Sequence, residues 1–266
     1  MEKKRAIELS DVARDMSFKL KYGDYMPHLA GSSSDKNQEY YGDYDFFCLV
    51  KKPTTVEEAF TNIFNIINRI KKDRDFYFIE LKVQLVNGVK IRFNNSNLSD
   101  LVKLKVAKMK DIDFIKIDFV TREVHQFIDI SCIYKFIEPD TIEDEADDLD
   151  IEPLKEDMDK YLKEGDIYKA LKREYSINNI TGNTERNNEL LKLFNSKYGK
   201  MYKMRNTLGA ILHVLQAGYN DKGTINKIEH NLTEDNIKTP LNKIKSYIKK
   251  LEGITNNEAK KYMVKK

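Results

Sequence analysis

The sequence predicts an α+β fold in which a mixed sheet with flanking helices is followed by an all-helical domain. Apolar and polar residues alternate strongly between 75 and 136, and Asn87-Gly88 interrupts them as a hairpin turn would. After Pro139 this alternation ends, and the long segments from Pro153 onward have helical spacing. A chain of 266 residues is long enough for two domains, which we place at 1–140 and 150–266.

The first half is expected to contain helices and strands in alternation before the hairpins begin. Ser10 or Asp11 is suited to cap the first helix, and Thr55 with Glu58 has the spacing of a capping box at the second. The expected elements are a helix, a buried strand, a helix and a group of hairpin strands, over 6–20, 43–50, 54–72 and 75–136.

The second half is expected to be helical throughout. Leu190, Leu193, Phe194 and Tyr198 recur at helical spacing, and Gly218 suits a helix end. Six of the eight residues in 143–150 are acidic, which favours a linker between the two domains or an exposed edge. The expected helices cover 154–165, 167–175 and 187–218.

Composition favours an intracellular protein without a membrane segment. No stretch approaches the roughly 20 apolar residues of a membrane helix, and the N-terminus lacks a signal-peptide core. Cys48 and Cys132 both lie in apolar runs, which predicts buried thiols rather than a disulfide or a zinc site. The abundance of Lys, Asn and Ile is typical of an AT-rich genome, such as that of a large DNA virus.

Paired carboxylates carry the chemical argument. In a strand, Asp43 and Asp45 project to the same face, where two charges 4 Å apart would repel by about 4 kcal/mol at an effective dielectric near 20. Divalent cations would compensate, and Mg²⁺ or Mn²⁺ suits such hard oxygen ligands when substrate phosphates complete the shell. Upstream, Gly31 permits close backbone approach, while Ser32 and Ser33 could hold a triphosphate.

These motifs resemble those of the DNA polymerase β-like nucleotidyltransferase superfamily. The resemblance rests on Ala30-Gly31-Ser32 and, after a spacer, on Asp43-Tyr44-Asp45-Phe46. It implies a catalytic domain with two metal ions bound by Asp43, Asp45 and a third carboxylate on a later strand. A helical domain would close the cleft over the substrate.

Two residues could supply the third carboxylate. Asp118 lies in IKIDFV and Asp129 in FIDISCI, both between apolar residues of strand-like runs. We favour Asp118 as the third catalytic and metal-binding acid, with Asp129 as the alternative. The acid that is not the third carboxylate is expected to pair with a lysine such as Lys116 or Lys82.

A basic helix in the second half could contact the nucleotide. Lys169, Lys172 and Arg173 lie close together in IYKALKREY, where they could hold the triphosphate or simply form a solvated surface. Tyr168 and Tyr175 flank them and could stack a base. The isolated His213, in ILHVL, is expected to be a core residue.

The resemblance implies transfer of a nucleoside monophosphate from NTP or dNTP to a hydroxyl, with release of pyrophosphate. We favour the 3′ end of single-stranded RNA or DNA as acceptor, as in a poly(A) polymerase or terminal transferase, because the second half is rich in lysine and tyrosine. A net charge of only +3 predicts weak binding of nucleic acid by this chain alone, so a partner subunit could contribute to binding. The alternatives are modification of a small molecule, protein or tRNA end, signalling-oligonucleotide synthesis, or a catalytically silent nucleic-acid-binding or scaffold subunit.

Overall fold

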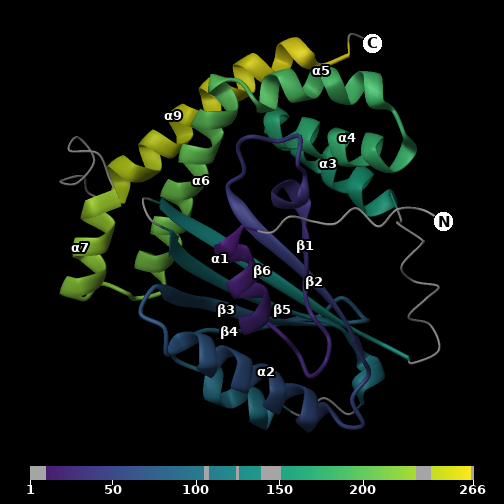
Figure 1. Ribbon diagram of the computed structural model, residues 1–266, viewed down its shortest axis with the longest axis vertical. Coiled ribbons are helices and arrows are strands. Elements are labelled where there is room, and N and C mark those ends of the chain that lie inside the picture. The colour runs from purple at the N-terminus through teal and green to yellow at the C-terminus, as the bar shows by residue number, and fades with distance from the viewer. Residues whose placement is uncertain (1–9, 105–107, 124–125, 139–150, 232–240, 265–266) are drawn as a thin grey trace.

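A mixed six-stranded sheet forms the centre of the molecule (Figure 1). The computed structural model describes residues 10–104, 108–123, 126–138, 151–231 and 241–264. Strand order is β1-β2-β6-β5-β3-β4; β2 and β6 run parallel, and the other neighbouring pairs run antiparallel. The strands are β1 (His28–Ala30), β2 (Asp43–Lys51), β3 (Phe76–Leu85), β4 (Lys90–Phe93), β5 (Ile112–Glu123) and β6 (Gln126–Ile137).

Two helices cover one face of this sheet, α1 (Asp11–Lys19) and α2 (Val56–Lys71). Their predicted N-caps are confirmed, because the Ser10 side chain accepts a hydrogen bond from the Ala13 amide and Thr55 accepts one from the Glu58 amide. Tyr44, Phe46, Cys48 and Val50 of β2 point into the core beneath these helices. Successive strand residues alternate between faces, so Asp43 and Asp45 point to the opposite side.

The predicted hairpin and buried thiols are also confirmed. Strands β3 and β4 pair antiparallel around Asn87-Gly88, and Gly88 adopts a φ of +84° that a glycine tolerates well. Cys48 and Cys132 are free and buried. Short 3-10 helices among the described residues lie at Gly31–Ser34, Leu98–Lys103 and Met109–Asp111, and another, Lys260–Tyr262, follows the last long helix.

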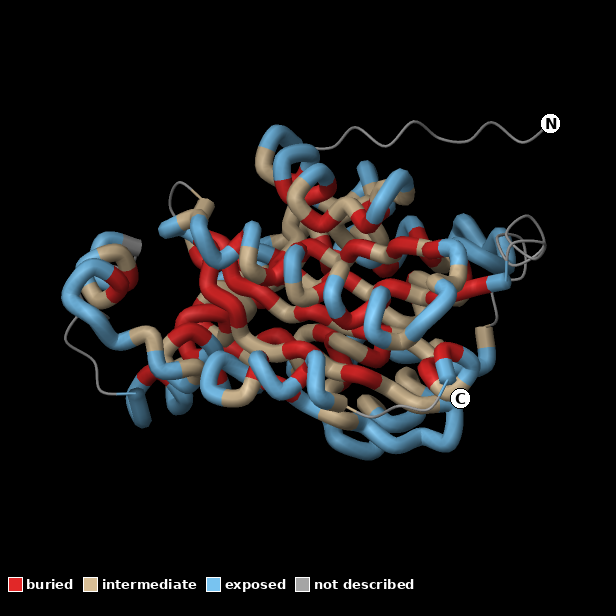
Figure 2. The backbone as a smooth tube through the Cα atoms, turned by 90° about the horizontal axis from the view of Figure 1, so that it is seen from below, coloured by how far each residue is buried: buried red, intermediate tan, exposed pale blue. Residues whose placement is uncertain are grey.

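All described regular structure after β6 is helical, as expected. Helix α6 lies against the sheet, where Leu208 and Ile211 share a core with Tyr77, Val120 and Phe127 of the strands. A separate core joins α4, α5 and α6, and Figure 1 shows α4 and α5 beyond one end of the sheet. Figure 2 shows buried positions through the middle of the molecule and exposed positions around its outside. The helices are α3 (Glu152–Glu164), α4 (Ile167–Thr181), α5 (Thr184–Phe194), α6 (Lys197–Gln216), α7 (Lys222–Asn231) and α9 (Leu241–Ala259).

The helix predicted over 187–218 is wrong in its continuity, because the chain breaks at Asn195 and Ser196 into α5 and α6. The Ser196 hydroxyl caps the new helix by accepting a hydrogen bond from the Tyr198 amide. At Gly199 a Cβ would lie only 1.7 Å from the carbonyl oxygen of Phe194, so this tight corner requires glycine. The apolar spacing continues through the break because both helices contribute to one core.

Two further expectations lie partly or wholly outside the described residues, namely the acidic linker at 143–150 and the first residues of the helix predicted over 6–20. None of the described helices is both long enough and apolar enough to cross a membrane.

Candidate active site

A cleft of about 650 Å³ opens where β2, the 3-10 turn at Gly31–Ser34 and helices α4 and α6 meet. This volume is in the range of small-molecule sites. Sequence reasoning anticipated nine of its lining residues, which come from both halves of the chain: Gly31, Ser32, Asp43, Asp45, Asp129, Lys169, Lys172, Arg173 and Tyr175. Two other predicted residues, Ser33 and Asp118, do not line it.

Strand register determines which carboxylates are neighbours. Asp43 of β2 stands directly opposite Asp129 of β6, and Asp45 stands opposite Ser131. Asp118 of β5 faces Ser131 from the other side, so a whole strand separates it from Asp45. Asp129 is therefore the carboxylate adjacent to the pair on β2.

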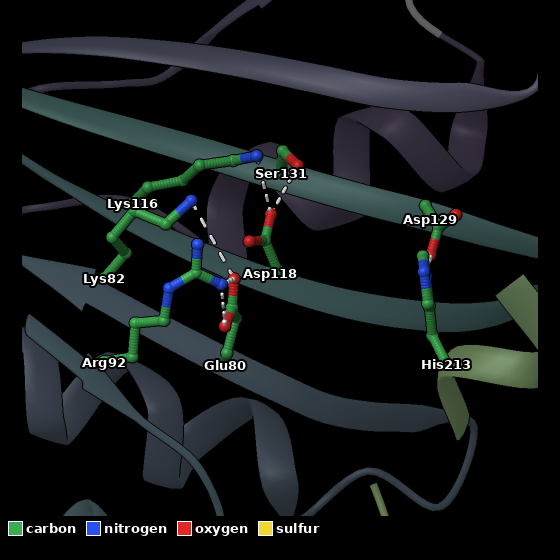
Figure 3. A network of polar contacts seen from close by, with 8 residues as sticks. All are labelled: Glu80, Lys82, Arg92, Lys116, Asp118, Asp129, Ser131 and His213. Carbon is green, nitrogen blue, oxygen red and sulfur yellow. Dashed lines mark hydrogen bonds and ion pairs between the residues drawn. The ribbon is translucent and has the colours of Figure 1, made fainter. Parts of the chain in front are cut away.

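Asp118 is engaged away from the cleft (Figure 3). Its Oδ1 atom accepts a hydrogen bond from the Ser131 hydroxyl at 2.5 Å and lies 3.1 Å from Nζ of Lys116. This is the lysine pairing that we expected of whichever acid is not the third carboxylate.

Asp129 instead contacts a helix (Figure 3). Its Oδ1 atom lies 2.9 Å from Nδ1 of His213 on α6. Burial raises the pKa of Asp129, and the His213 hydrogen bond opposes that rise. The same hydrogen bond raises the pKa of His213. The expected core position of His213 is wrong, because its side chain is 51% exposed and points toward the sheet rather than into the helical core.

The Gly31 turn is fitted to Asp45. Gly31 has a φ of +65°, and a Cβ there would lie 2.8 Å from Oδ2 of Asp45. The close backbone approach expected of this glycine is thus made to the carboxylate itself. The Ser33 hydroxyl donates to the carbonyl oxygen of Ala30 at 3.2 Å, and the Ser34 hydroxyl donates to that of Gly31 at 2.8 Å. Ser34, rather than Ser33, is the second serine that lines the cleft beside Ser32, although its hydroxyl proton is held within the turn.

The paired carboxylates repel each other, and the surrounding cations offset that repulsion only in part. Burial, and then the charge of Asp43, raise the pKa of Asp45 to about 7. Within the part of the chain that the structure describes, neither carboxylate forms an ion pair or a side-chain hydrogen bond. A cation brought with the substrate would relieve this repulsion.

The donor set suits Mg²⁺ held partly by a substrate. No group of three or more His, Cys, Asp or Glu side chains among the described residues is arranged to hold a metal ion. Mg²⁺ usually binds through one or two carboxylates while phosphates and waters complete its shell, so no closed protein cage is needed. Asp43 and Asp45 fit this mode because both are oxygen donors on one face and lack other partners.

Of the three predicted cations, Lys172 is the one without an ion-pair partner among the described residues. Lys169 pairs with Asp166 at 3.0 Å, and Nε of Arg173 lies 3.2 Å from Asp157. Lys172 forms no ion pair with any described residue. Burial lowers its pKa, and the charges of Asp43 and Asp45 oppose that change. These carboxylates thus act on Lys172 across the cleft.

Part of the cleft lining is polar in a way that the sequence does not indicate. Asp35, Gln38 and Asn178 line it, and each has a buried side-chain atom without a hydrogen-bond partner: Oδ2, Oε1 and Nδ2, respectively. Burial, and then the adjacent Asp35, raise the pKa of Tyr175 to about 12. In the sequence, Asp35 and Gln38 look like ordinary loop residues, because acids and amides are common in loops. The spacing of Asn178 and Asn179 from Lys172 was the only sequence signal for this part of the cleft.

Tyr175 and Tyr168, the two tyrosines expected to stack a base, differ in whether they reach the cleft. Tyr175 lines the cleft, although its side chain is largely buried. Tyr168 packs inside the helical core, where its ring stacks on Tyr202 with centroids 4.2 Å apart. Tyr168 is therefore a structural residue, and the expectation that it could stack a base is wrong.

Comparison with solved structures identifies the fold. The M. chilensis Mg662 protein complexed with GTP aligns over 89% of this chain and 86% of its own, with a TM-score of 0.64 and 12% identity. Two structures of a nucleotidyl transferase encoded by a Megaviridae ORFan gene align over 89% of this chain and 83% and 86% of theirs, with TM-scores of 0.62 and 0.60 and identities of 12% and 11%. No family model matches the sequence, and no curated protein matches it significantly. The chain thus has a nucleotidyltransferase fold.

Proposed function

We propose that this protein is a metal-dependent nucleotidyltransferase that transfers a nucleoside monophosphate from a nucleoside triphosphate to a hydroxyl group. The observation that carries the proposal is the pair Asp43 and Asp45, which faces the cleft without an ion-pair or hydrogen-bond partner among the described side chains. Burial, and then the charge of Asp43, raise the pKa of Asp45 to about 7. The named activity of the structural neighbours, and the GTP bound to one of them, support it.

The nucleotide would lie along α4. Its triphosphate would meet Lys172 and the turn at Gly31–Ser34, which presents the Ser32 and Ser34 side chains. Asn179 follows Lys172 by two helical turns, about 10 Å along the axis, which approximates the span from phosphate to base. The unsatisfied atoms of Asp35 and Asn178 would then face the base. A carboxylate acceptor beside an amide donor matches the N1–H and N2–H₂ donors and the O6 acceptor of guanine.

Asp43 and Asp45 would hold Mg²⁺ or Mn²⁺, with two ions in the reacting complex. When bound, the ions would neutralise the triphosphate and polarise the reacting oxygens. We propose Asp129, rather than the initially favoured Asp118, as the third carboxylate, because Asp129 stands opposite Asp43 and lines the cleft. The hydrogen bond from His213 fixes the orientation of the Asp129 carboxylate, which can then orient the acceptor hydroxyl.

For the acceptor we retain the 3′-hydroxyl of single-stranded RNA or DNA, added to in the manner of a poly(A) polymerase or terminal transferase. Modification of a small molecule, protein or tRNA end remains the second candidate. A silent scaffold is disfavoured because a protein without catalysis gains nothing from two unpaired, mutually repelling carboxylates that cost stability. The origin of the protein in a large DNA virus, its intracellular location and its association with a partner subunit stay predictions.

The test is nucleotide incorporation. Wild-type protein and an Asp43→Ala/Asp45→Ala variant are incubated with Mg²⁺ or Mn²⁺, each labelled NTP and dNTP, and single-stranded RNA and DNA primers. The exposed Asp24→Ala variant is the control for a lost carboxylate. Primer extension by wild type and control, but not by the double variant, supports the proposal. Label on a protein or small product would identify the second candidate, and no incorporation anywhere would refute transferase activity.

A further inference from the structure

Three cations form a row across the sheet face that carries the active-site carboxylates. Arg92 of β4 stands opposite Lys82 of β3, which in turn stands opposite Lys116 of β5. Figure 3 shows these side chains on one side of Asp118, with the Asp129–His213 pair on the other. We call Arg92, Lys82 and Lys116 the cation row. It does not line the nucleotide cleft.

The direct ion-pair partners of the row among the described residues do not neutralise it. Glu80 lies 3.1 Å from Arg92 and 3.8 Å from Lys82, and Asp118 lies 3.1 Å from Lys116. Three cations therefore share two carboxylates. Like charges directly opposite each other weaken a sheet, and the pKa of Lys82 is lowered first by burial and then by Lys116. Such a row is stabilised when a further anion binds.

The position of the cation row relative to the active-site carboxylates indicates which substrate would carry the bound anion. Lys116 of the row lies two residues from Asp118 along β5. Asp118 stands opposite Ser131 of β6, which in turn stands opposite Asp45 of β2, so these residues connect the row to Asp45. With strands about 4.8 Å apart and about 3.4 Å per residue, Lys116 is about 12 Å from Asp45. The nucleotide cleft lies on the β1–β2 side and the row lies on the β5–β4 side.

Nucleotidyl transfer displaces pyrophosphate in line, so the attacking hydroxyl enters opposite the triphosphate. If the triphosphate occupies the turn at Gly31–Ser34 and Lys172, the acceptor enters over β6 and β5. We infer that the cation row binds backbone phosphates of a single-stranded nucleic-acid acceptor within the last few nucleotides of its 3′ end. This inference rests on the proposed function, because the direction of entry follows from where the triphosphate binds.

The experiment separates acceptor binding from nucleotide binding. A labelled single-stranded RNA or DNA 12-mer is titrated by fluorescence anisotropy, without nucleotide, at several salt concentrations. The test variant is Arg92→Gln/Lys82→Gln, and the control is Lys249→Gln/Lys250→Gln, which removes the same charge from exposed positions of α9. The single Arg92→Gln variant, at a side chain that is 60% exposed, guards against misfolding. Stabilisation by GTP and Mg²⁺ in thermal melts reports nucleotide binding in each variant.

The test variant is expected to bind the 12-mer about tenfold more weakly, with the log–log salt slope reduced by about 1.4, or about 0.7 for each lost phosphate contact. The single variant should show about half that change in slope, while the control and the GTP stabilisation stay as in wild type. Equal affinity in wild type, test and control would overturn the inference. If wild type binds GTP but no oligonucleotide, the inference is overturned and nucleotidyl transfer still stands. If wild type does not bind GTP, the proposed function itself is overturned.

Discussion

Replacing Asp45 by Asn should stabilise the nucleotide-free protein while abolishing transfer. Burial and the Asp43 charge raise the pKa of Asp45 from an ordinary 3.8 to about 7. At about 1.36 kcal/mol per pKa unit, the ionised carboxylate destabilises the fold by about 4 kcal/mol above pH 7. Burying an Asn amide costs about 1–2 kcal/mol, so the expected net gain is about 2–3 kcal/mol.

The pH dependence has a defined sign. A raised folded-state pKa means that the native protein binds more protons than the unfolded chain between pH 3.8 and about 7. Wild-type stability therefore falls as pH rises through that window, whereas the amide introduced by Asp45→Asn does not titrate. The advantage of Asp45→Asn should be small at pH 5, grow toward pH 7 and remain constant above it.

Thermal melts in EDTA between pH 5 and 8.5 measure this difference. A chain of this size should gain about 2–4 °C in melting temperature per kcal/mol. Adding Mg²⁺ and GTP should raise the melting temperature of wild type and leave the variant nearly unchanged. The exposed Asp24→Asn variant should follow wild type throughout. A variant that is less stable than wild type at pH 8, or a difference that does not vary with pH, would refute the electrostatic reasoning.

Three further substitutions test the cleft. Gly31→Ala should cost about 1–2 kcal/mol of stability, because alanine is strained at its positive φ. It should also weaken GTP binding, because the new Cβ would lie 2.8 Å from Asp45. Gly23→Ala, also at positive φ but with nothing within 4 Å, controls for strain alone in thermal melts and GTP titrations. Asp129→Asn should reduce transfer about 100-fold or more and Asp118→Asn less than tenfold; the reverse order in primer extension would restore Asp118 as the third carboxylate. Asp35→Asn should weaken GTP binding about tenfold more than ATP binding, because guanine offers two donors to this carboxylate; equal losses in competition titrations would contradict guanine recognition.

Local features were predictable because few residues decide them. The alternation in β2 places Asp43 and Asp45 on one face whatever the rest of the chain does, and Thr55 caps α2 through an amide three residues away. The sequence predicts that the backbone approaches closely at Gly31, although only the fold shows that the approach is made to Asp45.

Features that depend on distant pairing were not predictable. Asp118 and Asp129 both lie between apolar residues, and only the parallel pairing of β6 with β2 places Asp129 beside Asp43. His213 is flanked by apolar residues as a core histidine would be, yet a helix turns each successive side chain by about 100°, so its own side chain faces the carboxylates. Asp35 lies in a loop, and only the fold brings it beside Tyr175 of α4 at the cleft.

The register of β2 against β6 couples stability to chemistry. The two strands pair residue for residue from Asp43 opposite Asp129 to Lys51 opposite Ile137. Even-numbered residues of β2 fill the core beneath α1 and α2, while odd-numbered residues near its start face the cleft. A slip of one residue would bury both aspartates and expose Tyr44 and Phe46, so the apolar core excludes that register. The fold can therefore tolerate the repulsion between Asp43 and Asp45, because the opposite face of the same strand secures their position.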